Sequence, residues 1–195
     1  MINVSRETRG KLDAFASLLL EENTRQNLIS KATENDLWAR HIEDGLQLVH
    51  HAPDAESWAD IGSGPGLPGL VIAIASGLPT TLVEPRPLRV DFLRRAVTSL
   101  ALEKVSIVQG KADVARGKFD AITARAVAKA PDLLRITMHL SHAGTRWVLP
   151  KGRTVQSELE ALESTWQGVF RVEPSLTDPE AGILIAERVR PRGKR

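Results

Sequence analysis

The sequence predicts an α/β fold: a mostly parallel, seven-stranded sheet with helices on both faces, preceded by an N-terminal helical extension. Three observations predict it. In the first 50 residues, apolar side chains recur at helical spacings of three and four. From Ser57 onward, short apolar runs alternate with helical segments, which is typical of a parallel sheet. Between the first run and its helix lies a glycine-rich loop, as in folds that bring the backbone close to a ligand.

The N-terminal part is predicted to contain two helices. The first spans residues 5–22, in which Leu12, Phe15 and Leu19 form an apolar stripe. The pattern Thr33-x-x-Asp36 predicts a capping box for a second helix that ends near His50. We expect residues 1–52 to pack as an extension on the α/β domain, residues 53–195, in one globular unit.

Seven apolar runs are expected to be strands. They are residues 57–61, 80–84, 105–109, 119–124, 145–149, 168–172 and 183–188. The last two are expected to pair antiparallel, because no helix joins them. The fifth is expected to be closed by Pro150-Lys151-Gly152, and Pro131 fits the first turn of the helix before it.

Composition excludes several classes of protein. The absence of cysteine excludes disulfides, a thiolate zinc site and a cysteine nucleophile, and no metal site is predicted. Neither a signal peptide nor a membrane-spanning run is found, so we expect a cytoplasmic protein without a membrane partner. The net charge is only +2, but basic residues crowd the C-terminus: Arg188, Arg190, Arg192, Lys194 and Arg195. This end is expected either to follow RNA phosphates or to be a disordered solubilising tail.

The spacing of the glycine loop indicates its ligand. Gly62, Gly64 and Gly66 form G-x-G-x-G, and Leu67 occupies the place of the third glycine in a dinucleotide fingerprint. With Asp60 two residues before, the pattern resembles the first motif of Rossmann-like, class I S-adenosylmethionine-dependent methyltransferases. A carboxylate beside the loop can meet the ammonium of that cofactor, directly or through water. The alternatives are a glycine-rich turn without a ligand and an NAD enzyme, which Leu67 argues against.

Other strand ends offer further candidates, because ligands of such sheets bind beyond the carboxyl ends of the strands. Glu84 lies 22 residues after Gly62 and is placed to accept from ribose hydroxyls. Asp113 is a candidate for the exocyclic amine of adenine, or a helix cap. Arg125 fits a carboxylate or phosphate, or an acceptor on a purine edge, or a surface ion pair.

The residues that are missing restrict the reaction. The end of the fourth strand, Thr123-Ala124-Arg125-Ala126, has no Asn/Asp-Pro-Pro-aromatic motif for methylation of an exocyclic amine. Pyrimidine C5 methylation needs a cysteine. Transfer to a nitrogen with a free lone pair needs neither, only alignment and exclusion of water. Guanine N7 is such an acceptor, and so is a nitrogen or oxygen of a small molecule.

Together these residues resemble one family, the bacterial small-subunit ribosomal RNA guanine-N7 methyltransferases (RsmG, also called glucose-inhibited division protein B). The resemblance covers residues 27–152. Its motifs are Asn27-Leu28, Arg40-His41-Ile42-x-Asp44, Asp60-Ile61-Gly62-Ser63-Gly64-Pro65-Gly66-Leu67-Pro68-Gly69, Arg89-x-x-Phe92-Leu93, Phe119-Asp120, Arg125-Ala126 and Lys151-Gly152. Gly45 stands where the family often has serine, so this position is expected to need a small residue.

The resemblance implies S-adenosylmethionine-dependent methylation of N7 of one guanine in a decoding-region loop of 16S rRNA. It implies cofactor contacts at Gly62, Leu67, Ala112, Asp113 and Arg125, to which the loop and strand ends add Asp60, Ser63, Gly64, Gly66 and Glu84. Arg125 is the predicted catalytic residue.

Arg40, His41 and Lys151 are the predicted RNA contacts, although His41 fits equally well a histidine whose hydrogen bonds are satisfied at a helix edge. The expected partner is 16S rRNA or a precursor of the small ribosomal subunit, bound by a monomer. Two alternatives stay open: a small-molecule methyltransferase of the same fold, and an RNA-binding module that has kept a relic cofactor loop.

Overall fold

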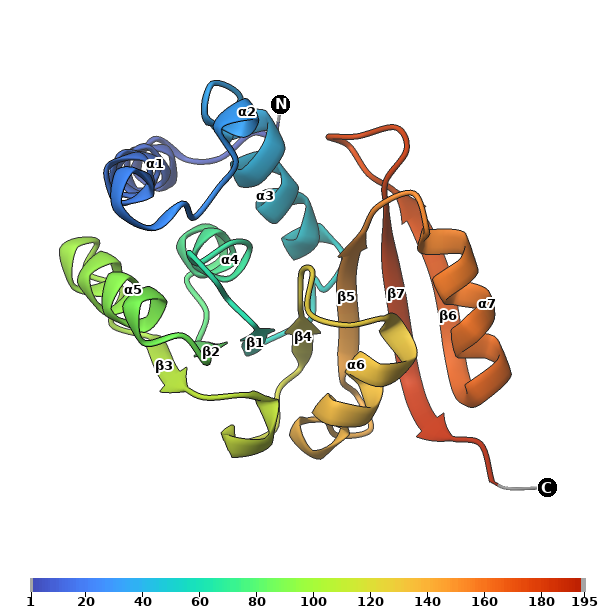
Figure 1. Cartoon of the computed structure of the whole chain (residues 1–195). Coiled ribbons are helices and arrows are strands. Elements are labelled where there is room, and N and C mark those ends of the chain that lie inside the picture. Colours follow the sequence, from blue (N-terminus) through green and yellow to red (C-terminus); the bar gives the residue numbers. More distant parts are fainter. Residues whose placement is uncertain (1, 194–195) are drawn as a thin grey trace.

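A seven-stranded sheet in the order β3-β2-β1-β4-β5-β7-β6 forms the centre of the computed structural model, which describes residues 2–193 (Figure 1). The strands are β1 Trp58–Ile61, β2 Thr80–Glu84, β3 Val105–Gln109, β4 Ala121–Thr123, β5 Arg146–Lys151, β6 Trp166–Pro174 and β7 Gly182–Pro191. The first five pair parallel, and β7 lies antiparallel between β5 and β6. This confirms the predicted fold class. The order of the strands reverses between β1 and β4: β2 and β3 lie on one side of β1, and β4 and β5 lie on the other. Such sheets bind ligands at this switch point.

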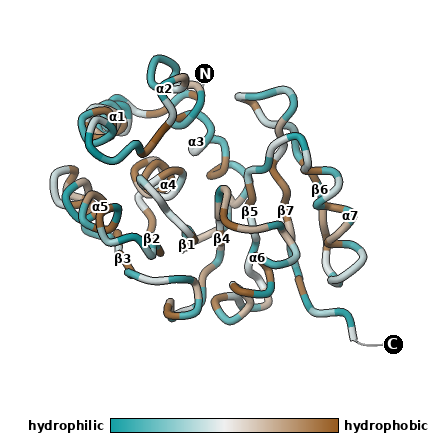
Figure 2. The backbone as a smooth tube through the Cα atoms, in the orientation of Figure 1, coloured by the Kyte–Doolittle hydropathy of each residue, from teal (hydrophilic) through white to brown (hydrophobic). Residues whose placement is uncertain are grey.

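Helices cover both faces of the sheet (Figure 1). One face carries α1 Arg6–Gln26, α3 Glu43–His50, α4 Gly69–Ser76 and α5 Pro87–Ser99, and the other carries α6 Ala130–Thr137 and α7 Val155–Thr165. The short helices are α2 Lys31–Glu34, η2 Ala112–Val114 and η3 Met138–Leu140. Figure 2 shows apolar residues concentrated in α4 and the central strands, as the fully buried residues Leu70 and Ile72 of α4 illustrate. Among residues 2–193, no helix is both long and apolar enough to cross a bilayer.

The first helix shares its core with the α/β domain. Ser5 begins α1 by accepting a hydrogen bond from the Thr8 amide, and Asn27 ends it in a left-handed conformation. The helix continues to Gln26, four residues beyond the end of the predicted span 5–22. The fully buried Leu12, Phe15 and Leu19 belong to one apolar cluster with residues of α4 and α5. The extension therefore completes the hydrophobic core on this face of the sheet.

The predicted capping box at Thr33 and Asp36 is wrong. Ser30 precedes α2, Thr33 lies within it, and the Thr33 hydroxyl donates to the Ser30 carbonyl. The chain then turns and forms one π-helical turn, η1 Trp38–Ile42, before α3 begins. A π-helical turn is wider than an α-helical one and is frequent at functional sites. Here it carries Arg40 and His41.

The C-terminal half differs from the prediction in two ways. Strand β5 continues through Pro150 and Lys151, because these residues pair with Ile183 and Gly182 of β7. Up to Gly193, the basic C-terminus is part of the fold and not a disordered tail. Strand β7 contains Arg188 and Arg190, and the Arg192 guanidinium donates to the Trp166 carbonyl. Lys194 and Arg195 lie outside the described residues. The antiparallel pairing of the last two strands is confirmed.

Candidate active site

The glycine loop after β1 depends on backbone conformations that side chains disfavour. Gly62, Gly64 and Gly66 have φ angles of 72°, 55° and 89°. A Cβ atom on Gly62 would lie 2.4 Å from Cγ2 of Val127. The loop after β1 and the segment after β4 therefore approach each other closely at the mouth of the crevice.

A cavity of about 530 Å³ opens at these strand ends. Its wall includes the loop residues Gly62–Pro65, the β2 end at Glu84, the segment Gly110–Ala112 and the β4 end at Arg125–Val127. The Glu84 side chain is buried, and its two carboxylate oxygens accept hydrogen bonds from the amides of Gly64 (2.7 Å) and Arg86 (2.9 Å). These bonds fix a carboxylate at the cavity wall and leave each oxygen a further lone pair.

Asp60 does not line this cavity, so of the two contacts predicted for it, direct or through water, the structure offers no direct one. Its side chain is 1% exposed and lies beneath the loop, where Oδ2 accepts from the Gly69 amide at the start of α4 (3.1 Å). Among the described residues, Oδ1 has no hydrogen-bond partner. Burial raises the pKa of this carboxyl to about 7, although hydrogen bonds and Arg125 oppose the shift. Ser63 supports the same region by donating to the Asp60 carbonyl (2.9 Å) and also lines the cavity.

Of the neighbours Ala112 and Asp113, only Ala112 lies at the first cavity. Ala112 is buried and forms part of the cavity wall, as predicted for a cofactor contact. The Asp113 side chain is exposed in η2 and is not part of that wall. The structure therefore does not bring Asp113 into the cavity with Glu84 and Arg125.

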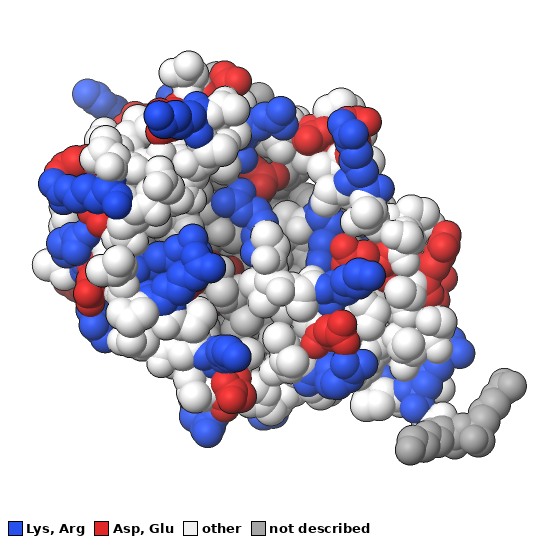
Figure 3. Space-filling model, in the orientation of Figure 1, with Lys and Arg blue, Asp and Glu red and all other residues white. Residues whose placement is uncertain are grey.

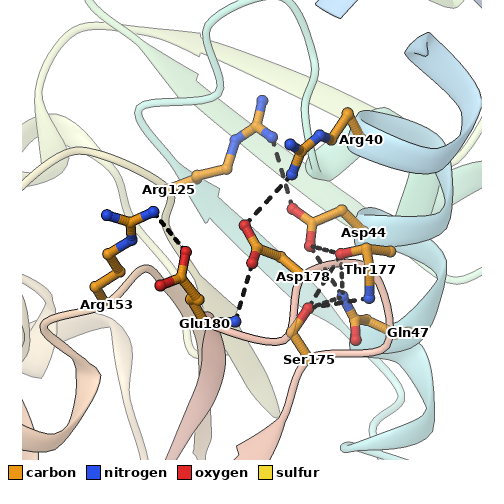
Figure 4. A network of polar contacts seen from close by, with 9 residues as sticks. All are labelled: Arg40, Asp44, Gln47, Arg125, Arg153, Ser175, Thr177, Asp178 and Glu180. Atoms are coloured by element: carbon orange, nitrogen blue, oxygen red, sulfur yellow. Dashed lines mark hydrogen bonds and ion pairs between the residues drawn. The ribbon is translucent and has the colours of Figure 1, made fainter.

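Arg125 stands between two cavities. It lines the first and also a second one of about 180 Å³, whose wall includes Asp44, Pro150 and Ser175. Its Nη1 lies 3.2 Å from His41 Nδ1 and 3.7 Å from Asp44 Oδ2, so two groups of the N-terminal extension hold the guanidinium (Figure 4 shows the Asp44 contact). Burial lowers the Arg125 pKa, and the charges of Asp44 and Asp60 oppose this shift.

His41 holds Arg125 instead of presenting a nitrogen to RNA. Burial, with Arg125 and Arg40 nearby, lowers its pKa to about 4, so the ring is neutral at pH 7. Nδ1 accepts from Arg125, which leaves the proton on Nε2 to be donated to Thr33 Oγ1 (3.1 Å). Both ring nitrogens are thus used within the protein, which matches the alternative of a histidine whose hydrogen bonds are satisfied at a helix edge.

A polar network connects α3 to the loop between β6 and β7 (Figure 4). Gln47 Nε2 donates to Asp44 Oδ1 (2.9 Å), and the Leu176 amide donates to Gln47 Oε1 (2.8 Å). Thr177 Oγ1 donates to the same Asp44 oxygen (3.1 Å). Sequence analysis missed Gln47 and Thr177. The sequence offered one signal for Gln47: it follows Asp44 by three residues, so the two lie on the same side of a helix. In the structure Gln47 is 1% exposed.

The two remaining predicted RNA contacts differ in exposure. Arg40 is half exposed and pairs with Asp178 at 3.3 Å, at the rim of the second cavity. Lys151 is only 9% exposed: its ammonium lies 2.8 Å from Glu158 Oε2 and donates to the Ala128 carbonyl (3.0 Å). Lys151 therefore fixes the segment after β4. It also lines the second cavity, so its contact with RNA stays a prediction.

Basic side chains surround the mouth of the first cavity. Arg86, Arg89 and Lys111 line it, and a shallow hollow beside it is lined by Arg25 and Arg86 with the exposed Leu88. Figure 3 shows lysine and arginine side chains around a hollowed region of this face, with some acidic side chains among them. An anionic partner is the natural ligand of such a surface.

Comparison with solved structures defines the class of protein. A cofactor-bound structure of Rv0187 from MTB superposes with a TM-score of 0.67 at 15% identity, covering 92% of this chain and 89% of that one. An O-methyltransferase from Bacillus cereus in complex with SAH has a TM-score of 0.62 at 16% identity, with coverage of 89% and 90%. The fold is that of class I S-adenosylmethionine-dependent methyltransferases, which confirms the predicted class.

The sequence identifies the family within this class. The family model GidB, described as rRNA small subunit methyltransferase G, matches residues 8–177. Proteins named ribosomal RNA small subunit methyltransferase G from Rhizorhabdus wittichii and Zymomonas mobilis are 44% and 42% identical, and each comparison covers 98% of this chain and 90% of the relative. The chain belongs to the rRNA small subunit methyltransferase G family, and it is an S-adenosylmethionine-dependent methyltransferase, as the sequence motifs predicted.

The first cavity fits that cofactor. Its volume of about 530 Å³ lies within the range of small-molecule sites, about 300–1,000 Å³. The glycine loop offers backbone without Cβ atoms, and Glu84 offers a fixed acceptor suited to ribose hydroxyls. Leu67, Val83 and Ile136 supply apolar wall for an adenine ring. Asp60 fits an indirect role, because it fixes the loop from beneath.

Proposed function

We propose that this methyltransferase methylates N7 of one guanine in a decoding-region loop of 16S rRNA. The observation that carries the proposal is the position of Arg125, a partly buried guanidinium between a cavity that fits the methyl donor and a second, smaller cavity. Gly62, Gly64, Leu67 and Ala112, which line the first cavity, hold the cofactor by close backbone approach, and Glu84 accepts from its ribose. Gly66 shapes the loop, because a Cβ there would meet Leu70. Asp60 and Ser63 act through the loop.

The reaction needs alignment more than acid–base chemistry. S-adenosylmethionine, when bound, supplies an activated methyl group. The N7 lone pair forms the new C–N bond while the C–S bond breaks, so the positive charge passes from sulfur to the guanine ring and no proton leaves. Arg125 orients the acceptor, and the segment 125–127 closes over the glycine loop to exclude water. The neutral His41 holds Arg125 without competing for the methyl group.

The RNA partner is 16S rRNA or a precursor of the small subunit, bound by a monomer in the cytoplasm, where ribosomal subunits assemble. Arg86, Arg89 and Lys111 contact phosphates around the cavity mouth, and Arg40 does so at the rim of the second cavity. Binding should weaken steeply as salt rises, because each phosphate contact releases counterions. A small-molecule methyltransferase would be indifferent to salt.

The N-terminal residues 1–52 form an extension of the methyltransferase domain, residues 53–195, and not a domain that folds alone. The shared apolar cluster of α1, α4 and α5 supports this division. The contacts of His41 and Asp44 with Arg125 support a part for the extension in the site.

The deciding experiment maps N7-methylguanine by chemical cleavage in rRNA from cells with and without the gene. We expect one cleavage site in the small-subunit RNA to disappear when the gene is removed. An unchanged map would refute the assignment, and calorimetry without S-adenosylmethionine binding would indicate a relic cofactor loop.

A further inference from the structure

We propose that the second cavity is the pocket for the methyl-accepting base and that Asp44 reads its N1–H and N2 amine. This inference rests on the proposed function and adds a residue that selects guanine. The cavity, of about 180 Å³, adjoins the first through Arg125, which lines both. A base seated there has one edge facing the methyl donor across Arg125.

The Asp44 carboxylate is fixed and has spare acceptor capacity. Its side chain is 20% exposed, and Oδ1 is held by Gln47 Nε2 at 2.9 Å and by Thr177 Oγ1 at 3.1 Å. Oδ2 lies 3.7 Å from Arg125 Nη1, which is longer than a hydrogen bond. Figure 4 shows this carboxylate directed toward Arg125 and Asp178. A partly buried carboxylate, one oxygen of which accepts no hydrogen bond from the protein residues described, is suited to accept from donors of a ligand.

The order of groups along the pocket matches the order of groups on guanine. Along the base edge, the N2 amine and N1–H are donors, followed by the O6 acceptor and then N7. Along the protein, the acceptor Asp44 is followed by the donor Arg125 and then by the first cavity. Guanine in this register places N1–H and N2 at Asp44, O6 at Arg125, and N7 toward the cofactor. Adenine reverses the groups at positions 1 and 6 and meets unmatched partners in both places.

The remaining wall suits the flat face of a base. Pro150, Gly182 and Ile183 give the same cavity an apolar wall beside Lys151, whose ammonium is paired with Glu158. Gly182 approaches Val172 so closely that a Cβ there would lie 2.8 Å from Cγ1 of that residue, which keeps this wall flat. The Arg40–Asp178 pair stands at the rim, half exposed, where the nucleotide's backbone would lie.

The same contact assists the transfer itself. Methylation leaves a positive charge on the guanine ring, shared with the N1–H and N2 donors. A carboxylate bound to those donors interacts more strongly with the product-like transition state than with neutral guanine. Asp44 should therefore affect kcat as well as KM.

The test replaces the mapped guanine by inosine, which keeps N7, O6 and N1–H but lacks the N2 amine. With the unaltered enzyme, we expect kcat/KM to fall roughly 10- to 100-fold, the effect of a lost hydrogen bond to a charged group. In Asp44→Asn, methylation of guanine RNA should fall, and the ratio between guanine and inosine should shrink toward one. Its affinity for S-adenosylmethionine, measured by calorimetry, should be unchanged.

The controls separate the possible failures. Asparagine keeps the Oδ1 acceptor for Gln47 and Thr177, and Asp54→Asn, at an exposed turn, is the matched surface variant. Equal rates on guanine and inosine with the unaltered enzyme would overturn this inference while leaving the proposed function standing. So would an Asp44→Asn variant that keeps the original ratio. No transfer to guanine RNA by the unaltered enzyme would overturn both.

Discussion

Replacing Lys151 by methionine separates a structural role from an RNA contact. The Lys151–Glu158 ion pair is nearly buried, with exposures of 9% and 13% and an N–O distance of 2.8 Å. Removing one partner of a buried pair costs about 3–5 kcal/mol, because the other charge stays buried. Glu158 retains the Ala130 amide as a donor (2.7 Å), so we expect the lower end, about 3 kcal/mol.

For a chain of 195 residues, such a loss lowers Tm by about 6–12 °C. Urea unfolding followed by tryptophan fluorescence measures the free energy directly. The double variant Lys151→Met/Glu158→Gln should recover most of the loss, since no unpaired charge then remains and the amide oxygen still accepts from Ala130. Lys129→Met is the matched control at an exposed lysine nearby.

The contrary result is equally well defined. If Lys151 served RNA binding and had no structural role, Lys151→Met would have the same free energy of unfolding as the unaltered protein. It would instead reduce by about one the slope of log binding constant against log salt. That pair of observations would refute the structural role.

Three further predictions follow from the site and its supports. Arg125→Ala should reduce methyl transfer roughly 100-fold or more with an unchanged circular dichroism spectrum, because a charged donor is lost beside the acceptor; unaltered transfer would remove this residue from the mechanism. The Asp60 carboxyl keeps its proton up to about pH 7 in the folded state but only to about 3.8 when unfolded, so stability is lost as pH rises through this interval. The loss in the free energy of unfolding between pH 4 and pH 8 is up to about 4 kcal/mol, and Asp60→Asn should abolish it. Urea unfolding at several pH values measures this, and parallel pH profiles for the two proteins would contradict it. Gly45→Ala places a Cβ 2.8 Å from Val71 Cβ, and overpacking by about 1–3 kcal/mol should outweigh a helix-propensity gain of about 1 kcal/mol. Thermal unfolding should show this loss, and Val71→Ala should cost less in the Gly45→Ala protein than alone.

The sheet was predictable wherever short apolar runs have clear boundaries. The predicted bounds of β2 and β3 agree with the structure to the residue. Pro85 follows β2, and Gly110 follows β3, so turn-forming residues stop both strands. Strand β5 was predicted too short because its last two residues are kept extended by β7, which is distant in the sequence. Local pattern cannot supply that partner.

The site was predictable as a set of strand ends, but not as a set of contacts. Gly62, Gly64, Glu84 and Arg125 meet in one cavity, as the topology of a parallel sheet requires. The burial of Lys151 depends on Glu158 in the following helix, and the use of both His41 nitrogens depends on a π-helical turn that has no side-chain signature. These facts arise from tertiary packing, where a lysine's partner decides whether its charge faces solvent.

The last strand has a consequence for the order of synthesis. β7 pairs with β5 on one side and β6 on the other, although it is made after both. Until residues 182–191 have left the ribosome, β5 and β6 each expose an unpaired edge, which is a template for association with other chains. A nascent chain that stops at residue 177 would contain the cofactor loop and Arg125 yet have an open sheet. We therefore expect such truncated chains to aggregate or be degraded. The arginine-rich strand β7 is then needed for solubility because its backbone pairs with the edges of β5 and β6.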